Sequence, residues 1–115
     1  MAVKKFEDLL VWQKSQDIAV LIYKNFTNLK DYSFKDQILR ASVSISNNIA
    51  EGFDRRTNTD FIRFLHMATS SNSEVRSMLY LSKRLGYLHR EVFEDLLDKS
   101  NEISKMLYGL IQSMK

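Results

Sequence analysis

The feature that most constrains the fold is an uncharged segment in the middle of the chain, ASVSISNNIA at residues 41–50. The apolar side chains in and just before it recur at intervals of three and four, the spacing of one helical face: Ile38, Ala41, Ile45 and Ile49. The other positions carry mainly serine and asparagine rather than the lysine and glutamate of a solvated face. We therefore expect a helix that neighbouring helices and sister chains cover on most of its circumference.

The scarcity of helix breakers indicates an all-α fold. The 115 residues include no proline and only three glycines, whereas a sheet protein needs many turns. Apolar residues make up 44% and charged residues 27% of the chain, which is the range of ordinary globular proteins. A chain of this length is expected to form one domain, residues 1–115, around one core.

Features that the sequence lacks limit where the protein is expected to be located and which chemistry it can perform. No cysteine is present, which excludes disulfides and thiolate metal sites and fits a cytoplasmic protein. Glu7 and Asp8 interrupt the N-terminal segment before an apolar run forms, which argues against a signal peptide. The longest apolar run, residues 18–23, is far too short to span a bilayer, so no membrane partner is expected.

Periodic apolar stripes predict four helices. Their expected bounds are Asp8 or Leu10 to Asn28, Phe34 to Phe53 or Asp54, Asp60 to Leu85, and Arg90 to Met114. Because the connections are short, consecutive helices should be antiparallel neighbours in an up-down-up-down four-helix bundle.

Polar residues and glycines mark the expected helix ends. Ser33, with Asp36 three residues later, forms a variant of the capping box at the start of the second helix. A threonine or asparagine within residues 57–59 should cap the third helix. Gly86 stands just past the last turn of that helix, where glycine commonly ends one.

The chain carries no recognisable catalytic or metal-binding constellation. His66 and His89 lack the paired carboxylates or histidines of a general base, so we interpret both as surface residues. No repeated Glu-x-x-His pattern of a di-iron bundle and no glycine-rich phosphate loop is present. We expect neither an enzyme nor a metal or cofactor.

Five residues stand out as a structural polar motif: Ser44, Asn48, Glu51, Gly52 and Glu74. Asn48 falls near the apolar face, and since an unpaired buried amide costs about 1–3 kcal/mol, it should bond to another helix. Glu51 is a candidate for an ion pair at a helix seam with Arg40, Arg55 or Arg76, and Glu74 is a similar candidate. Gly52 marks a helix stop or a kink. The motif either fixes the register of the helices or contacts a ligand or nucleic acid, and both readings stay open.

The basic residues fall into separate groups in the sequence. Arg55, Arg56 and Arg63 cluster around the turn between the second and third helices, and Lys83 lies at the far end of the third. The formal net charge of the chain is only +3, so one copy is weakly basic. Each basic residue is either a solvated surface residue or a phosphate-binding one. In the second case the groups, repeated around a ring of subunits, sum to an electrostatic field that holds phosphates.

Four segments carry a resemblance to a known family. They are FEDLLVWQKSQDIAVLIY at residues 6–23, ASVSISNNIAEGFDR at 41–55, FIRFLHMATSSNSEV at 61–75 and RLGYL at 84–88. Together they resemble the four-helix bundle protein family named after the 23S rRNA intervening sequence, over almost the whole chain. The NIAEG string, with VWQK before it and F-x-x-F-L after it, is the specific part.

The resemblance implies a short up-down-up-down bundle that assembles into a homopentameric, ring-like homo-oligomer. It also implies a bacterial protein of a kind often labelled ribosomal protein-like, although it gives no reason to expect a ribosome component. A related branch is the accessory protein of diversity-generating retroelements, which is similar in fold and binds nucleic acid and a reverse transcriptase. RNA, DNA and a reverse transcriptase are therefore the partners that the resemblance suggests.

The family pattern maps onto positions of this chain with three departures. The matching positions are Trp12, Gln13, Arg40, Ser44, Asn48, Glu51, Gly52, Arg55, Phe61, Phe64, Leu65 and Glu74. Leu39 stands where the family often has a second basic residue, Ser46 where it often has proline, and Ser70 where it often has glycine. The lost positive charge weakens the hypothesis of nucleic-acid binding, whereas the other two departures concern helix bending and packing.

Two functions follow as hypotheses. The first is a non-enzymatic oligomeric bundle that binds structured RNA or another nucleic acid through a basic surface formed on oligomerisation. Its expected phosphate contacts are Arg40, Arg55, Arg56, Arg63 and Lys83. The alternative is a protein–protein scaffold or accessory ring that binds no nucleic acid.

Overall fold

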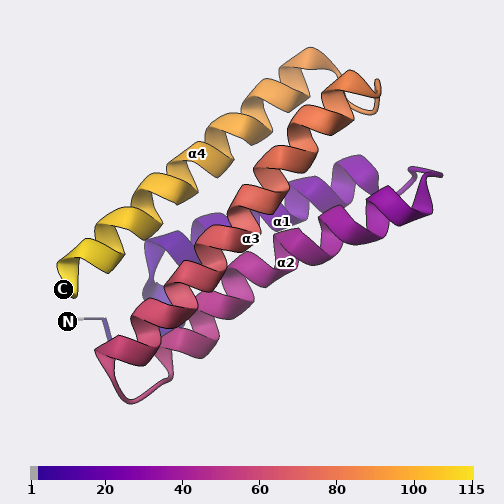
Figure 1. Cartoon of the computed structure of the whole chain (residues 1–115). Helices are drawn as coiled ribbons and strands as arrows, with labels where there is room; N and C mark the ends of the chain where they lie inside the picture. Colours follow the sequence, from indigo (N-terminus) through magenta and orange to yellow (C-terminus); the bar gives the residue numbers. More distant parts are fainter. Residues whose placement is uncertain (1–2) are drawn as a thin grey trace.

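The computed structural model describes residues 3–115, and this part of the chain is helical without a strand. It contains a short 3-10 helix η1 (Phe6–Asp8) followed by α1 (Leu10–Phe26), α2 (Tyr32–Phe53), α3 (Asn58–Arg84) and α4 (Arg90–Ser113). The prediction of an all-α chain with four helices is confirmed. Figure 1 shows the chain reversing direction at each of the three connections between these helices.

One hydrophobic core runs between the four helices. α2 contacts α1 and α3, and α4 contacts α3 and α1, so the helices enclose the core together. The apolar stripes predicted from the sequence supply it, and the fully buried side chains include Ile18, Ile22, Phe26, Ile38, Ile45, Ile49, Leu65, Val75, Leu79, Leu96, Ile103 and Leu107.

The start of α2 differs from the prediction. Asp31, not Ser33, caps the helix, and its carboxylate accepts the backbone N–H of Phe34 at 3.2 Å. Ser33 lies inside the first turn, so the expected capping box does not form. An aspartate at this position suits the N-terminal end of a helix because it satisfies a free N–H group and complements the dipole.

The two ends of α3 agree with the prediction. Thr57 caps its start by accepting the N–H of Asp60 at 3.1 Å. At its other end Gly86 has φ +77°, a left-handed conformation that favours glycine. The Gly86 N–H donates to the Lys83 carbonyl and the Tyr87 N–H to the Ser82 carbonyl, the double hydrogen bond of a Schellman motif.

Gly52 lies one residue before the end of α2, close to the predicted helix stop, and it has a further role in packing. The glycine is buried against α3, and a Cβ at this position would lie 2.5 Å from the Cβ of Phe64 and 3.1 Å from a ring carbon of Phe61. A real side chain does not fit in that space. Glycine is therefore required by the close approach of the two helices.

The neutral segment at residues 41–50 is only partly covered by the chain itself. Ala41, Ser42, Ile45, Ser46 and Ile49 are buried, and four of the others are half-buried. Asn47 is exposed, so one flank of the segment faces outward. Neighbouring helices of the same chain therefore cover the core-facing side of this helix, and the expected cover of its outward flank by sister chains stays a prediction.

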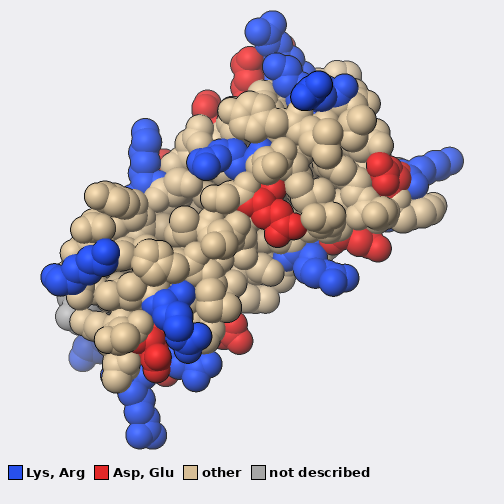
Figure 2. All heavy atoms as spheres, in the orientation of Figure 1, with Lys and Arg blue, Asp and Glu red and all other residues tan. Residues whose placement is uncertain are grey.

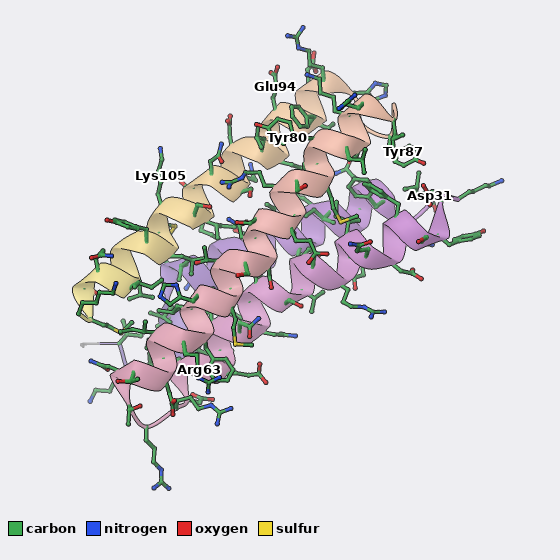
Figure 3. The ribbon with its side chains drawn as sticks, viewed as in Figure 1. Asp31, Arg63, Tyr80, Tyr87, Glu94 and Lys105 are labelled. Carbon is green, nitrogen blue, oxygen red and sulfur yellow. The ribbon has the colours of Figure 1, made fainter. Side chains whose placement is uncertain are left out.

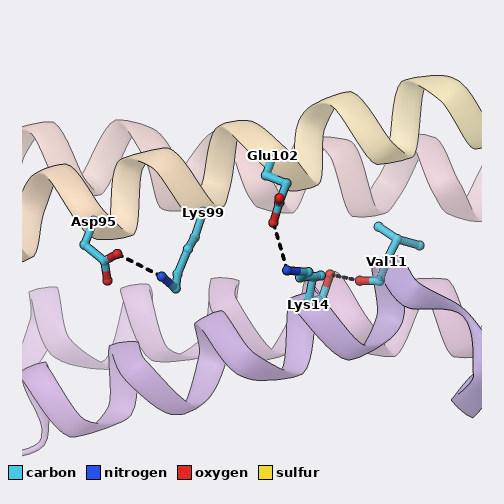
Figure 4. A network of polar contacts seen from close by, with 6 residues as sticks. Val11, Lys14, Asp95, Lys99 and Glu102 are labelled. Carbon is cyan, nitrogen blue, oxygen red and sulfur yellow. Dashed lines mark hydrogen bonds and ion pairs between the residues drawn. The ribbon is translucent and has the colours of Figure 1, made fainter.

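One ion pair joins α1 to α4, and a second lies within α4 beside it, as Figure 4 shows. Lys14 of α1 lies 3.4 Å from Glu102 of α4, and Lys99 lies 2.8 Å from Asp95 one turn earlier on its own helix. All four side chains are at least 40% exposed, so each pair contributes at most about 1 kcal/mol. This seam is held mainly by the core below it.

Candidate nucleic-acid interface

Arginines gather where α2 ends and α3 begins. The guanidinium of Arg55, in the connecting turn, lies 4.7 Å from the ring centre of Phe64, and that of Arg63 lies 4.8 Å from the same ring. Arg63 also lies 3.8 Å from the carboxylate of Asp60. Figure 3 shows Arg63 near the start of α3, at this end of the molecule. A cation above an aromatic face is attracted to it, so Phe64 orients both side chains.

A cavity of about 440 Å³ opens beside these arginines. Its basic lining residues are Arg55, Arg56 and Lys115, and its aromatic ones are Phe53 and Phe61. Lys115 follows the end of α4, so the cavity brings together segments that are far apart in the sequence. Figure 2 shows several basic side chains around the end of the molecule where α2 joins α3.

The other two expected phosphate contacts lie elsewhere. Arg40 lines a shallow depression on α2 together with Asp36 and Ser44. Lys83 lies near the opposite end of α3, with its ammonium 4.9 Å from the ring centre of Phe93. Within one chain, the structure therefore groups Arg55, Arg56 and Arg63 and separates Arg40 and Lys83 from them.

The predicted bonding of Asn48 is wrong. Its amide donates to the Ser44 carbonyl at 2.8 Å, within its own helix, and the Ser44 hydroxyl in turn donates to the Arg40 carbonyl at 3.0 Å. Asn48 is only half-buried. Its position at the border of the apolar face lets it bond locally, so it joins no second helix.

The expected ion pairs of Glu51 and Glu74 are also absent from residues 3–115. Glu51 is exposed and lies within 4.0 Å of no basic group there. Glu74 does bridge this seam, but by accepting a hydrogen bond from the amide of Gln37 at 3.1 Å. The link between the helices is therefore neutral on the α2 side.

The main polar link between helices is one that sequence reasoning missed. Asn72 of α3 is fully buried and donates to the Ser100 carbonyl and the Ser104 hydroxyl of α4, both at 2.9 Å. Its amide oxygen accepts the hydroxyl of Ser100, also at 2.9 Å. A signal was present, because Asn72 falls on the apolar stripe between Ala68 and Val75.

A second missed contact joins the connections at the other end of the molecule. The hydroxyl of Tyr87 donates to the carboxylate of Asp31 at 2.6 Å, and Figure 3 shows the two side chains side by side. This hydrogen bond, with that from the Phe34 N–H, lowers the pKa of Asp31 below its ordinary value. The same contact raises the pKa of Tyr87, because ionising the phenol would remove the donated proton. The two residues are 56 positions apart, so no local pattern reveals them.

No group of three histidine or carboxylate side chains within residues 3–115 is placed to hold a metal ion. His66 and His89 are both exposed, as expected for surface residues. In the same part of the chain, no helix has the length and apolar character needed to cross a membrane.

These features define an all-α protein of four helices with a basic, partly aromatic hollow at one end. A family model described as 23S rRNA-intervening sequence protein matches residues 7–109, and the chain belongs to this family. No match was found among curated proteins.

A solved structure supports this assignment. It is a crystal structure of a protein of unknown function from the S23 ribosomal protein family of Bacteroides thetaiotaomicron. This chain is similar to it with 36% sequence identity and a TM-score of 0.84, over 89% of this chain and 98% of that one. The resemblance read from the sequence motifs is thus confirmed.

Proposed function

We propose that this protein is a non-enzymatic up-down-up-down four-helix bundle that assembles into a ring-like homo-oligomer and binds nucleic acid through a basic surface. The observation that carries the proposal is the group of cations at the α2–α3 end: Arg55, Arg56, Arg63 and Lys115. Repetition of this group around a ring multiplies a charge that is modest in one chain, and phosphates respond to the summed field.

The first support for assembly is the outward flank of α2. Between α1 and α2 lies a shallow groove whose lining includes Ala19, Val20, Tyr23 and Val43. Val20 is 51% exposed and Tyr23 is 42% exposed, and the flank beside them is the neutral part of residues 41–50. Lys24 is the one charged residue that lines the groove, and the apolar side chains around it suit contact with another protein surface.

The second support is a stripe on α3. Leu81 and the C-cap residue Leu85 are four residues apart, and Met67 lies on the same side of the helix 14 residues earlier, with the exposed Glu74 between them. Each of the three is more than 40% exposed. A ring needs two different complementary patches on every subunit, and this stripe supplies a partner for the α1–α2 groove. Five subunits is the number that the family resemblance implies.

Replacement of Ser44 by arginine tests the assembly. Ser44 is half-buried on the outward flank of α2, so a long charged side chain there should block a subunit contact. Sedimentation should show an oligomer for the parent and smaller species for Ser44→Arg, while Ser73→Arg, an equal change at an exposed site outside both patches, should leave the oligomer intact. A 13.5 kDa monomer at micromolar concentration for the parent would refute assembly.

Salt dependence tests nucleic-acid binding. Affinity for a structured RNA or duplex DNA should fall as salt rises, with a slope of about 0.7–0.9 per phosphate contact. Arg56→Glu should lower both affinity and slope. Arg90→Glu, which makes the same charge change at the far end beside Glu94, should alter them less. An intact oligomer that binds no nucleic acid at low salt would refute this function and leave the protein–protein scaffold in its place.

A further inference from the structure

The cavity at the α2–α3 end differs from its neighbours in the charge of its lining. Three basic residues line it, Arg55, Arg56 and Lys115, and no acidic residue does. The cavity on the α1–α4 seam is instead lined by Asp17, Asp98 and Glu102 as well as by two lysines. An anion is therefore the ligand that suits the α2–α3 end.

The floor of the same cavity is aromatic. Phe53 is half-buried and meets Phe61 edge to face, with ring centres 5.7 Å apart and planes at 87°. Phe61 is almost fully buried and anchors that pair in the core. Thr57, Asn58 and Ser113 add hydrogen-bonding groups around the opening. A ligand that carries both an anionic group and a flat ring matches this combination.

The basic side chains of the cavity differ in their contacts with the rest of the protein. Arg55 is held above Phe64, as described above. Arg56 is exposed and makes neither a hydrogen bond nor an ion pair within residues 3–115, although it lines the cavity. Its five N–H donors are therefore available to a planar or tetrahedral anion, and phosphate is one of the two anions whose geometry the guanidinium matches.

We propose that this cavity binds a nucleotide by its terminal phosphate monoester, either free or at the end of a strand, an inference that rests on the nucleic-acid binding proposed above. A monoester carries a charge of about −1.5 to −2 at neutral pH, more than the single charge of an internal phosphodiester. A volume of about 440 Å³ is in the range of small-ligand pockets and holds one nucleotide rather than a stretch of duplex. The base then lies against Phe53.

The test compares one short RNA in three forms, with a 5′-phosphate, a 3′-phosphate or hydroxyls at both ends, by titration calorimetry on the full-length oligomer. Adenosine monophosphate and inorganic phosphate are titrated beside them. We expect at least one phosphorylated RNA to bind about tenfold more tightly than the hydroxyl form. Adenosine monophosphate should bind more tightly than inorganic phosphate because its base stacks on an aromatic ring.

Three variants locate the effect. Arg56→Ala should abolish the preference for a terminal phosphate, whereas Arg90→Ala, which removes a cation at the far end of the molecule beside Glu94, should preserve it. Phe53→Leu should weaken the binding of adenosine monophosphate but not that of inorganic phosphate. Circular dichroism and sedimentation of each variant confirm that fold and assembly are unchanged, so that a loss of binding reports on the cavity.

The outcomes separate this inference from the function it rests on. Equal binding of all three RNAs overturns the cavity as a phosphate-end site and leaves nucleic-acid binding standing. A preference that survives Arg56→Ala also overturns it. If no RNA binds, the proposed function fails; adenosine monophosphate binding that Arg56→Ala removes would then retain the cavity as a mononucleotide site, and its absence would overturn that too.

Discussion

Replacing Gly52 by alanine adds one methyl group at a close contact between α2 and α3. The new Cβ would start 2.5 Å from the Cβ of Phe64, a distance that real Cβ atoms essentially never show. The obstructing atom belongs to the root of a side chain and cannot rotate away. We therefore expect the two helices to separate by a few tenths of an ångström or more and to lose packing along the contact.

The expected magnitude follows from two opposing effects. Overpacking of a close contact costs about 1–3 kcal/mol. Alanine is a better helix former than glycine by at most about 1 kcal/mol, which offsets part of that cost. Gly52→Ala should therefore destabilise the protein by about 1–2 kcal/mol. For a chain of 115 residues this lowers the melting temperature by about 4–8 °C.

Gly109 offers a matched control. It lies in α4, is exposed, and has no atom within 4 Å of where its Cβ would stand. Gly109→Ala should stabilise the protein by about 0.5–1 kcal/mol through helix propensity alone. Urea unfolding followed by circular dichroism, at one protein concentration because assembly contributes to stability, measures both variants. A gain of stability in both would refute the close-approach argument.

Three further changes test the polar contacts by urea unfolding. Asn72→Ala should destabilise the protein by about 2–3 kcal/mol because it strands buried partners on α4, whereas Asn48→Ala, which loses only a bond within α2, should change stability by at most about 0.5 kcal/mol; equal effects would contradict this. The lowered pKa of Asp31 stabilises the fold above about pH 4, and this contribution is lost as the pH falls. The raised pKa of Tyr87 stabilises it below about pH 10 and is lost as the pH rises, so Tyr87→Phe should flatten the pH profile of the urea midpoint at both edges; an unchanged profile would count against the contact. Thr57→Ala removes the cap of α3 and should cost about 1 kcal/mol, and a change below about 0.3 kcal/mol would show the cap to be dispensable.

Local patterns in the sequence predict the helices well and their polar contacts poorly. The stripe through Ile38, Ile45 and Ile49 repeats over several turns, so the helix it forms is predictable from spacing alone. Asp31 caps α2 through one carboxylate oxygen, which accepts the Phe34 N–H, while its other oxygen accepts the hydroxyl of Tyr87 from a distant connection. A short-range pattern of serine and aspartate carries no information about such a partner.

The same limit applies to the candidate site. The arginines around the α2–α3 turn were predicted as a group because they are close in sequence. Lys115 joins them only because α4 returns to that end of the molecule, which no composition or spacing reveals. Gly52 was recognised as unusual, but its reason lies in the distance between two helices rather than in the backbone.

The contact between Gly52 and Phe64 connects the hydrophobic core to the arginines at the α2–α3 end. Phe64 touches the glycine with its Cβ and attracts the guanidinium groups of Arg55 and Arg63 with its ring. Any change that alters the spacing of α2 and α3 must therefore displace both cations together. Mutations in this buried contact can thus move both guanidinium groups without altering a single charge.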